Sequence, residues 1–218
     1  MAETAGVDGC KAGWIVAHDC RAFVVPTFAD VIATLPPACV IALDMPIGLL
    51  DSHEPGGRAC DRALRAVLGS TRRGSVFSAP PRAALGSRTL PEAQARGARI
   101  NLQTLNILPK IEDVDAVMTP ALQRRVHEAH PECAFMAMND GIPVAAPKRS
   151  ADGRAQRIAL LTTHGVPIPE KPRGAAMDDL LDACALTWSA ERIAGGTAVQ
   201  VLSDPPLDAH GLAMQVRW

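Results

Sequence analysis

The sequence predicts an α/β fold built on a mixed sheet in which three antiparallel strands precede a β-α-β unit. Two glycines in the segment 9–13 favour a tight turn between two apolar segments. Thr27 is a typical helix N-cap, and Pro36-Pro37 would end that helix. The apolar run 40–43 is typical of a strand buried on both faces. These signals together predict one sheet flanked by helices.

The first three strands are expected at residues 4–8, 14–18 and 22–25. They are short, and turn residues separate the first from the second, so they should form an antiparallel meander. A helix from Thr27 to about Leu35 follows.

The fourth strand is expected at residues 40–43, and it ends at Asp44, where Met45-Pro46-Ile47-Gly48 breaks it. The first predicted strand also ends on an aspartate, Asp8. If the two strands are neighbours, both carboxylates lie at the same edge of the sheet.

Residues 46–125 are rich in Pro, Gly and Arg, and we interpret them as an insertion or cap within a single domain of residues 1–218. The insertion should hold a helix near 58–68, a Ser/Gly loop at 69–78, and helical pieces near 91–106 and 119–126.

The last part of the chain should complete the sheet and cover it. Weak alternation over residues 126–135 predicts a fifth strand, and a helix is expected near 151–163. A buried helix should run from Met177 to about Ile193 and end at Gly195-Gly196. The tail segments 198–202 and 211–218 are candidates for an edge strand.

Composition excludes several classes of protein. With 218 residues and 48% hydrophobic residues, the chain is too apolar for a disordered protein. It has no apolar run of 18 residues, and its start lacks the basic and apolar segments of a secretory signal. The six cysteines are scattered, without a CxxC pair, so we expect reduced thiols in a cytoplasmic protein with no membrane partner.

Charge and aromatic content limit the ways in which nucleic acid could bind. The formal net charge is −1, so the whole molecule would not attract nucleic acid strongly. Aromatic residues make up 3% of the chain and Tyr is absent, which argues against a base-stacking surface. A nucleic-acid or nucleotide partner would have to bind through local patches.

The most informative polar residues are five aspartates, namely Asp8, Asp44, Asp178, Asp179 and Asp182. The last three crowd the first turns of the predicted C-terminal helix, where capping would explain Asp178 or Asp179. Asp182 lies between apolar residues, so capping explains it badly. Converging carboxylates raise one another's pKa, and Mg²⁺ or Mn²⁺ relieves that repulsion. The alternatives are a metal site and ordinary capping and turn aspartates.

A second group is the segment 127–132, His-Glu-Ala-His-Pro-Glu. It is similar to a zinc-protease motif only superficially, because its histidines are three residues apart and a proline follows the second. As a strand, the segment would point Glu128, His130 and Glu132 to one side, where they are candidate catalytic residues. The alternative is a solvated edge strand.

Basic residues form the third group. Arg58, Arg62 and Arg65 share one face of a predicted helix, which suits phosphate binding. Lys11 and Lys110 are further candidates for substrate binding, and residues 148–157 hold a smaller basic patch. The alternative is a solvated helix face.

The order of motifs along the chain resembles the DUF429 family, whose members are predicted to be ribonuclease-H-like nucleases. The resemblance spans nearly the whole chain and is carried by seven segments: Val7-Asp8-Gly9-Cys10-Lys11-Ala12-Gly13-Trp14, Asp44-Met45-Pro46-Ile47-Gly48-Leu49, Arg58-Ala59-Cys60-Asp61-Arg62 with Arg65, Ser75-Val76-Phe77-Ser78-Ala79-Pro80, Asn106-Ile107 with Pro109-Lys110-Ile111, Glu128-Ala129-His130-Pro131-Glu132, and Asp178-Asp179-Leu180-Leu181-Asp182-Ala183.

The resemblance implies a ribonuclease-H-like fold, in agreement with the β-β-β-α-β order predicted above. It also implies that Asp179 and Asp182 correspond to the metal-binding helix of Holliday-junction resolvases, with Asp8 and Asp44 on the sheet. Two departures are Asp44, where the resolvases usually carry the longer Glu, and the large insertion, which could narrow the site to a small substrate.

Three functions are compatible with these residues. The first is a metal-dependent nuclease that hydrolyses phosphodiester bonds with two Mg²⁺ or Mn²⁺ ions. The second is a ribonuclease-H-like protein without nuclease activity that binds a nucleotide or a small phosphorylated metabolite. The third is a partner-binding domain whose aspartates are structural. The sequence does not indicate an oligomeric state.

Overall fold

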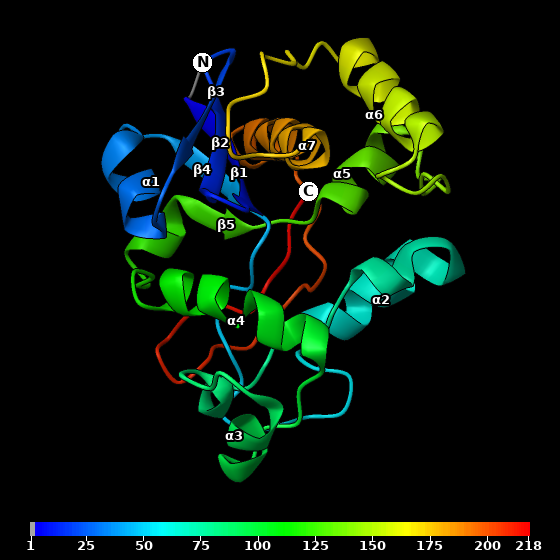
Figure 1. The fold of residues 1–218 in the computed structure, drawn as a ribbon. Helices are drawn as coiled ribbons and strands as arrows, with labels where there is room; N and C mark the ends of the chain where they lie inside the picture. Colours follow the sequence, from blue (N-terminus) through cyan, green and yellow to red (C-terminus); the bar gives the residue numbers. More distant parts are fainter. Residues whose placement is uncertain (1–2) are drawn as a thin grey trace.

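A computed structural model describes residues 3–218, and it places a five-stranded mixed sheet between helices (Figure 1). The strands lie in the order β3-β2-β1-β4-β5, with β1 antiparallel to β2 and parallel to β4. Their bounds are β1 (Thr4–Cys10), β2 (Gly13–His18), β3 (Arg21–Val25), β4 (Val40–Leu43) and β5 (Val126–Glu128). The predicted α/β class, with three antiparallel strands before a β-α-β unit, is confirmed.

Seven α-helices accompany the sheet in the described chain: α1 (Phe28–Thr34), α2 (Ala59–Arg72), α3 (Leu90–Ala95), α4 (Leu102–Asp115), α5 (Pro131–Met138), α6 (Ala151–Thr163) and α7 (Met177–Ala194). The helices expected at 27–35, 151–163 and 177–193 are confirmed. Thr27 caps α1 as predicted, because its side chain accepts from the Asp30 amide while the Asp30 carboxylate accepts from Thr27. None of the described helices has both the length and the apolar character needed to cross a membrane.

The expected fifth strand over residues 126–135 is wrong beyond Glu128. β5 ends there, His130 caps α5, and Pro131 begins that helix. A proline suits the first helical turn, because its fixed φ is helical and its missing N–H would be unpaired there anyway. Glu128, His130 and Glu132 therefore do not follow one strand and do not share one face of it.

Two further expectations differ from the structure. The helical piece expected near 119–126 is a single 3₁₀ turn, Leu122–Arg124, followed by β5, and α4 continues through Pro109 to Asp115. The tail segments form isolated bridges, which pair Arg217 with Ala129 and with Gln200 and Ala213 with Leu207, instead of an edge strand.

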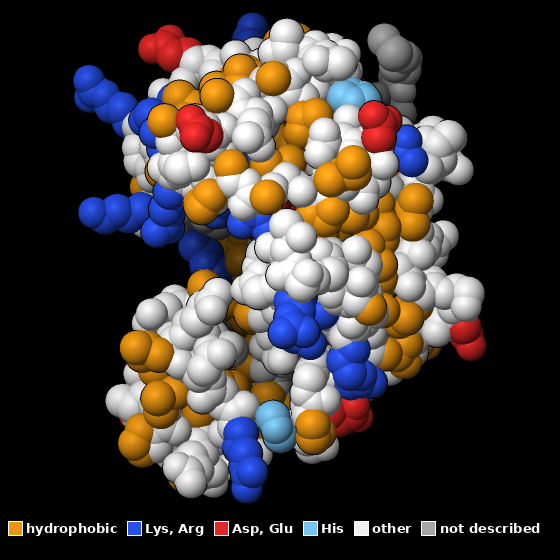
Figure 2. Space-filling view, turned by 90° about the vertical axis from the view of Figure 1, so that its right-hand side faces the viewer, with side chains coloured by type: hydrophobic (Ala, Val, Ile, Leu, Met, Phe, Trp, Pro, Cys, Tyr) orange, Lys and Arg blue, Asp and Glu red, His pale blue; other side chains and the backbone are white. Residues whose placement is uncertain are grey.

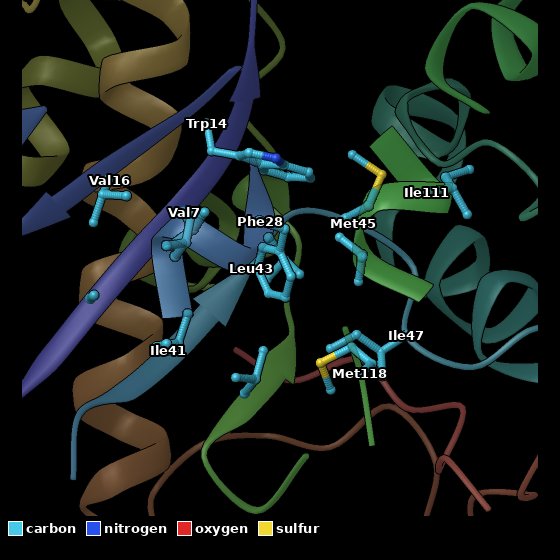
Figure 3. Close-up of a cluster of buried hydrophobic side chains, with 14 of the residues drawn as sticks. Val7, Trp14, Val16, Phe28, Ile41, Leu43, Met45, Ile47, Ile111 and Met118 are labelled. Carbon is cyan, nitrogen blue, oxygen red and sulfur yellow. The ribbon is translucent and has the colours of Figure 1, made fainter. Parts of the chain in front are cut away.

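The larger core lies on the sheet face that α1 and α4 cover, and it includes Val7, Trp14 and Phe28 (Figure 3). The indole of Trp14 lies 5.5 Å from the ring of Phe28, and its Nε1 donates to Asp113 at 2.6 Å. Strand residues that point to the opposite face pack against α5, α6 and α7.

The α7 helix approaches β1 very closely at Gly6. A Cβ atom at this position would lie 1.9 Å from the carbonyl oxygen of Ala183 and 2.4 Å from the amide nitrogen of Thr187. Only a glycine permits this contact between two backbones. Because Ala183 follows Asp182, the same contact holds Asp182 beside the end of β1.

Candidate active site

Three carboxylates from different elements meet at one end of the sheet. Asp8 belongs to β1, and Asp44 follows β4, where its amide donates to Val7 at 3.0 Å. Asp182 comes from the second turn of α7 and is 2% exposed, while Asp8 is 7% exposed and Asp44 is half-buried. The β1–β4 pairing and the α7–β1 contact thus bring these residues together from distant parts of the chain.

One ammonium group faces these carboxylates. Lys148, in the loop between α5 and α6, places its Nζ 2.6 Å from Oδ2 of Asp182. Burial lowers the pKa of Lys148, but the carboxylates of Asp182, Asp8 and Asp44 raise it overall, so this lysine stays protonated.

A single cation does not balance the carboxylates. Burial, followed by the charges of Asp44 and Asp182, raises the pKa of Asp8 well above its ordinary value. Burial likewise raises the pKa of Asp44, although His130 and Lys148 oppose the shift. Burial raises the pKa of Asp182 to about 6 against the opposing effect of Lys148. The site therefore has a strong tendency to bind protons or other cations.

These shifts make the stability of the protein depend on pH. Because the folded state holds the Asp182 proton more tightly than the unfolded chain, the free energy of unfolding should fall as pH rises from about 4 to about 6. Asp182→Asn should remove this loss, which is on the order of 3 kcal/mol. Urea unfolding of both proteins at several pH values measures the difference, with exposed Asp19→Asn as the control. Parallel profiles for wild type and Asp182→Asn would contradict the assignment.

Asp178 and Asp179 lie at the start of α7 and have partners of their own. Oδ2 of Asp178 is 3.3 Å from Nε of Arg149, and Oδ2 of Asp179 accepts from the Ala176 amide at 2.8 Å. The Asp179 contact is the helix cap that the sequence offered as an alternative. Both residues nevertheless line the same cleft as Asp8 and Asp44.

Asp8, Asp44, Asp178 and Asp179 line an open cleft of about 730 Å³, and Asp182 lies behind its wall, where it contacts Lys148. Its wall also includes basic and amide side chains, contributed by Lys11, Gln103, Asn106, Lys110, Lys148 and Arg149. Figure 2 shows a notch in the surface with Lys and Arg side chains gathered beside it. The cleft thus combines an acidic floor with basic groups around it, which suits a phosphate ester whose charge is bridged by cations.

The donor set fits Mg²⁺ or Mn²⁺ in its chemistry, since the buried ligands are carboxylate oxygens. Within residues 3–218, however, no three His, Cys, Asp or Glu side chains are already gathered in a metal-binding arrangement. Lys148 holds one oxygen of Asp182. Binding a metal would therefore require these aspartates to turn toward a common point and Asp182 to release the lysine.

The candidate catalytic residues Glu128, His130 and Glu132 differ in their surroundings. His130 lines the cleft, and its Nδ1 accepts from the Glu132 amide at 3.2 Å, so the ring proton is on Nε2. Both oxygens of Glu132 bind Arg157, at 2.7 and 2.9 Å. Both oxygens of Glu128 bind Arg58, at 2.5 and 2.8 Å. Of the three residues, only His130 is left facing the cleft without an ion pair.

Arg58, which precedes α2, and Arg62 and Arg65 within α2 mainly stabilise the insertion. Arg58 is 1% exposed and is enclosed by Asp61 and Glu128. Arg62 contacts Glu54 and the Gly57 carbonyl. Arg65 donates hydrogen bonds of 2.7 to 3.0 Å to the carbonyls of Val76 and Gly56 and to the Ser78 hydroxyl. None of these three arginines lines the cleft.

The lysines predicted to bind substrate do line the cleft. Lys11 is exposed there, whereas Nζ of Lys110 donates to the Gly13 carbonyl at 2.5 Å and lies 4.5 Å from the centre of the Trp14 ring. Lys148 and Arg149 belong to the basic patch at residues 148–157, and no signal in the sequence connects this patch to the aspartates. The connection is the ion pair between Lys148 and Asp182, which lie 34 residues apart in the sequence.

Comparison with known proteins agrees with the resemblance seen in the motifs. The family described as "Protein of unknown function (DUF429)" matches residues 6–207. Searches of curated proteins and of solved structures gave no match. Because the matched region covers most of the 218 residues and contains all of the cleft aspartates, the chain belongs to the DUF429 family.

Proposed function

We propose that this protein hydrolyses phosphodiester bonds with the help of Mg²⁺ or Mn²⁺. The observation that carries the proposal is the group of three carboxylates, Asp8, Asp44 and Asp182, which the single ammonium of Lys148 opposes beside an open cleft that Asp8 and Asp44 line. Such an excess of buried negative charge is costly unless cations offset it. Structural aspartates would not need to be gathered in this way.

The fold supports the same proposal. We infer a ribonuclease-H-like fold from the three antiparallel strands, the following β-α-β unit and the sheet order β3-β2-β1-β4-β5. In this arrangement the first and fourth strands are neighbours, so Asp8 and Asp44 lie side by side. The last long helix, α7, then adds Asp182 and Asp179 from one face of the sheet.

The residues of the cleft can be given separate tasks. Asp8, Asp44 and Asp182 would hold the metal, with Asp179 beside them. When bound, the ions would activate water and stabilise the leaving oxygen. Lys148 remains protonated and can donate to a phosphoryl oxygen once Asp182 releases it, while Lys11 can hold a neighbouring phosphate. His130 can pass a proton through Nε2.

The deciding test is calorimetric titration with Mn²⁺, combined with cleavage of bis(4-nitrophenyl) phosphate and of labelled DNA and RNA. We expect wild-type protein to bind Mn²⁺ and to cleave at least one substrate. Asp44→Asn should weaken binding by about tenfold or more and abolish cleavage without loss of folding. Asp19→Asn makes the same chemical change at an exposed hairpin position and should behave as wild type. Cleavage by Asp44→Asn would refute the proposal.

One observation favours a second function, the binding of a nucleotide or small phosphorylated metabolite without hydrolysis. Lys148 already forms an ion pair with Asp182, and the described side chains do not form a preorganised metal site. A protein of this kind would gain thermal stability from a nucleotide in the presence of EDTA and would cut neither DNA nor RNA. The same assays therefore separate the two functions.

A further inference from the structure

A second, smaller cavity lies beside β5, and its lining contains none of the cleft aspartates. Its volume is about 190 Å³, and its walls come from the turn 120–124, from His127, and from the C-terminal segment 213–217. The cavity and the cleft have no lining residue in common.

Backbone and amide contacts hold the two walls together. Gln123 donates to the Ala213 carbonyl and accepts from the Ala213 amide, both at 2.8 Å. The Arg217 amide donates to the Glu128 carbonyl at 3.0 Å, in a parallel bridge with Ala129. The C-terminal segment is thus fixed against β5, and Arg217 has a defined position beside His127.

The cavity gathers positive charge that nothing in the described chain neutralises. Arg124 and Arg217 both line it, and within residues 3–218 neither side chain forms an ion pair or a hydrogen bond. Glu128 is the acidic residue in the lining, but Arg58 takes both of its carboxylate oxygens. The two guanidinium groups therefore have no counter-charge of their own.

Partial burial makes this lack of a partner costly. Arg217 is half-buried, and burial lowers its pKa. Burial and then the charge of Arg217 lower the pKa of the neighbouring His127 to about 4, and a contact of its ring with the Arg124 backbone opposes the shift. A half-buried guanidinium is stabilised by an oxyanion, which its planar donors can bind in pairs.

We propose that the cavity is an anion site that binds a phosphoryl group, with Arg124 and Arg217 as its charged donors. Two cationic side chains match the charge of a phosphate near neutral pH. The family match ends at residue 207, so Arg217 and the wall that carries it lie outside the matched region. The inference does not depend on the proposed hydrolysis.

Calorimetry with inorganic phosphate in the presence of EDTA tests the site without the metal chemistry of the cleft. We expect saturable binding to wild type and at least about tenfold weaker binding to Arg217→Gln and to Arg124→Gln, because each loses a charge-assisted contact. Arg21→Gln, an exposed change on β3 at the far edge of the sheet, should bind as wild type. Absence of saturable binding, or equal binding by all variants, would overturn the proposal.

A second measurement on the unmodified protein keeps the test decisive if a variant does not fold. Phosphate should shift the ring resonances of His127 in a nuclear magnetic resonance titration, whether or not it also shifts those of His130 in the cleft. A shift confined to His130 would place the anion in the cleft and overturn the proposal.

Comparing the affinities for a nucleotide and for inorganic phosphate shows whether the site binds an esterified or a free phosphate. A 5′-nucleoside monophosphate that binds more tightly than phosphate, and that loses affinity in Arg217→Gln, would assign the site to an esterified phosphate. Equal or weaker binding of the nucleotide, with the same dependence on Arg217, would assign it to free phosphate. Either result supports the site. If the affinities for nucleotide and for phosphate are both unchanged in Arg217→Gln, the proposal is refuted.

Discussion

Replacing Arg58 with methionine should lower the free energy of unfolding by about 3–5 kcal/mol, because it leaves two buried carboxylates without their cation. Arg58 is 1% exposed, and its guanidinium lies 2.7 Å from Asp61 and 2.5 Å from Glu128. Both acids are themselves buried, with side chains 4% and 8% exposed. Methionine fills much of the space but carries no charge.

The loss should be large because Arg58 also joins three separate segments. Its Nη1 donates to the carbonyls of Ile47 and Gly48, both at 3.1 Å, in the segment that follows β4. The Ile47 amide in turn donates to Glu128 at 2.7 Å. Since Glu128 closes β5, the arginine ties α2 of the insertion to the central sheet.

Urea unfolding of Arg58→Met and Arg62→Met makes the comparison. The Arg62 side chain is 47% exposed, and its ion pair with Glu54 spans 3.5 Å, so its loss should cost at most about 1 kcal/mol. The sequence predicted both arginines as substrate ligands. If Arg58→Met kept wild-type stability but bound substrate poorly, Arg58 would be a ligand after all and its structural role would be refuted.

The sequence predicted those parts of the site that local signals determine. Asp44 follows a short apolar strand, Asp8 lies near the end of β1, which continues two residues beyond the predicted end to Cys10, and Asp182 interrupts an apolar stretch of helix. The three positions could therefore be recognised before the strands were known to be neighbours. The same kind of signal located α1, because Thr27 and Asp30 form a capping box within four residues.

Contacts between distant segments could not be predicted in this way. The spacing of Arg58, Arg62 and Arg65 suggested a surface that binds phosphate, yet the partner of Arg58 lies 70 residues away in β5. Lys148 is likewise separated from Asp182 by 34 residues. The end of β5 was also missed, because Pro131 can be read as an interruption of a strand or as the first residue of a helix.

Gly6→Ala should be among the most disruptive single-methyl changes in the protein. The added Cβ would lie 1.9 Å from the Ala183 carbonyl oxygen and 2.4 Å from the Thr187 amide nitrogen, and both are backbone atoms of α7. No side chain can rotate to relieve this overlap, so the helix must move away from β1. Overpacking of a rigid core costs about 1–3 kcal/mol, and we expect a loss at or above the upper end of that range.

The displacement of α7 should also affect the candidate metal site, because Asp182 immediately precedes Ala183. We expect Gly6→Ala to lower the melting temperature and, at temperatures where the variant remains folded, to weaken Mn²⁺ binding without removing any ligand. Gly74→Ala is the matched control, since a Cβ there would meet no atom within 4 Å. Wild-type stability of Gly6→Ala would contradict the close packing, whereas reduced stability with unchanged Mn²⁺ affinity would show that Asp182 does not contribute to metal binding. The same substitution therefore tests both the helix–strand contact and the role of the helix in the site.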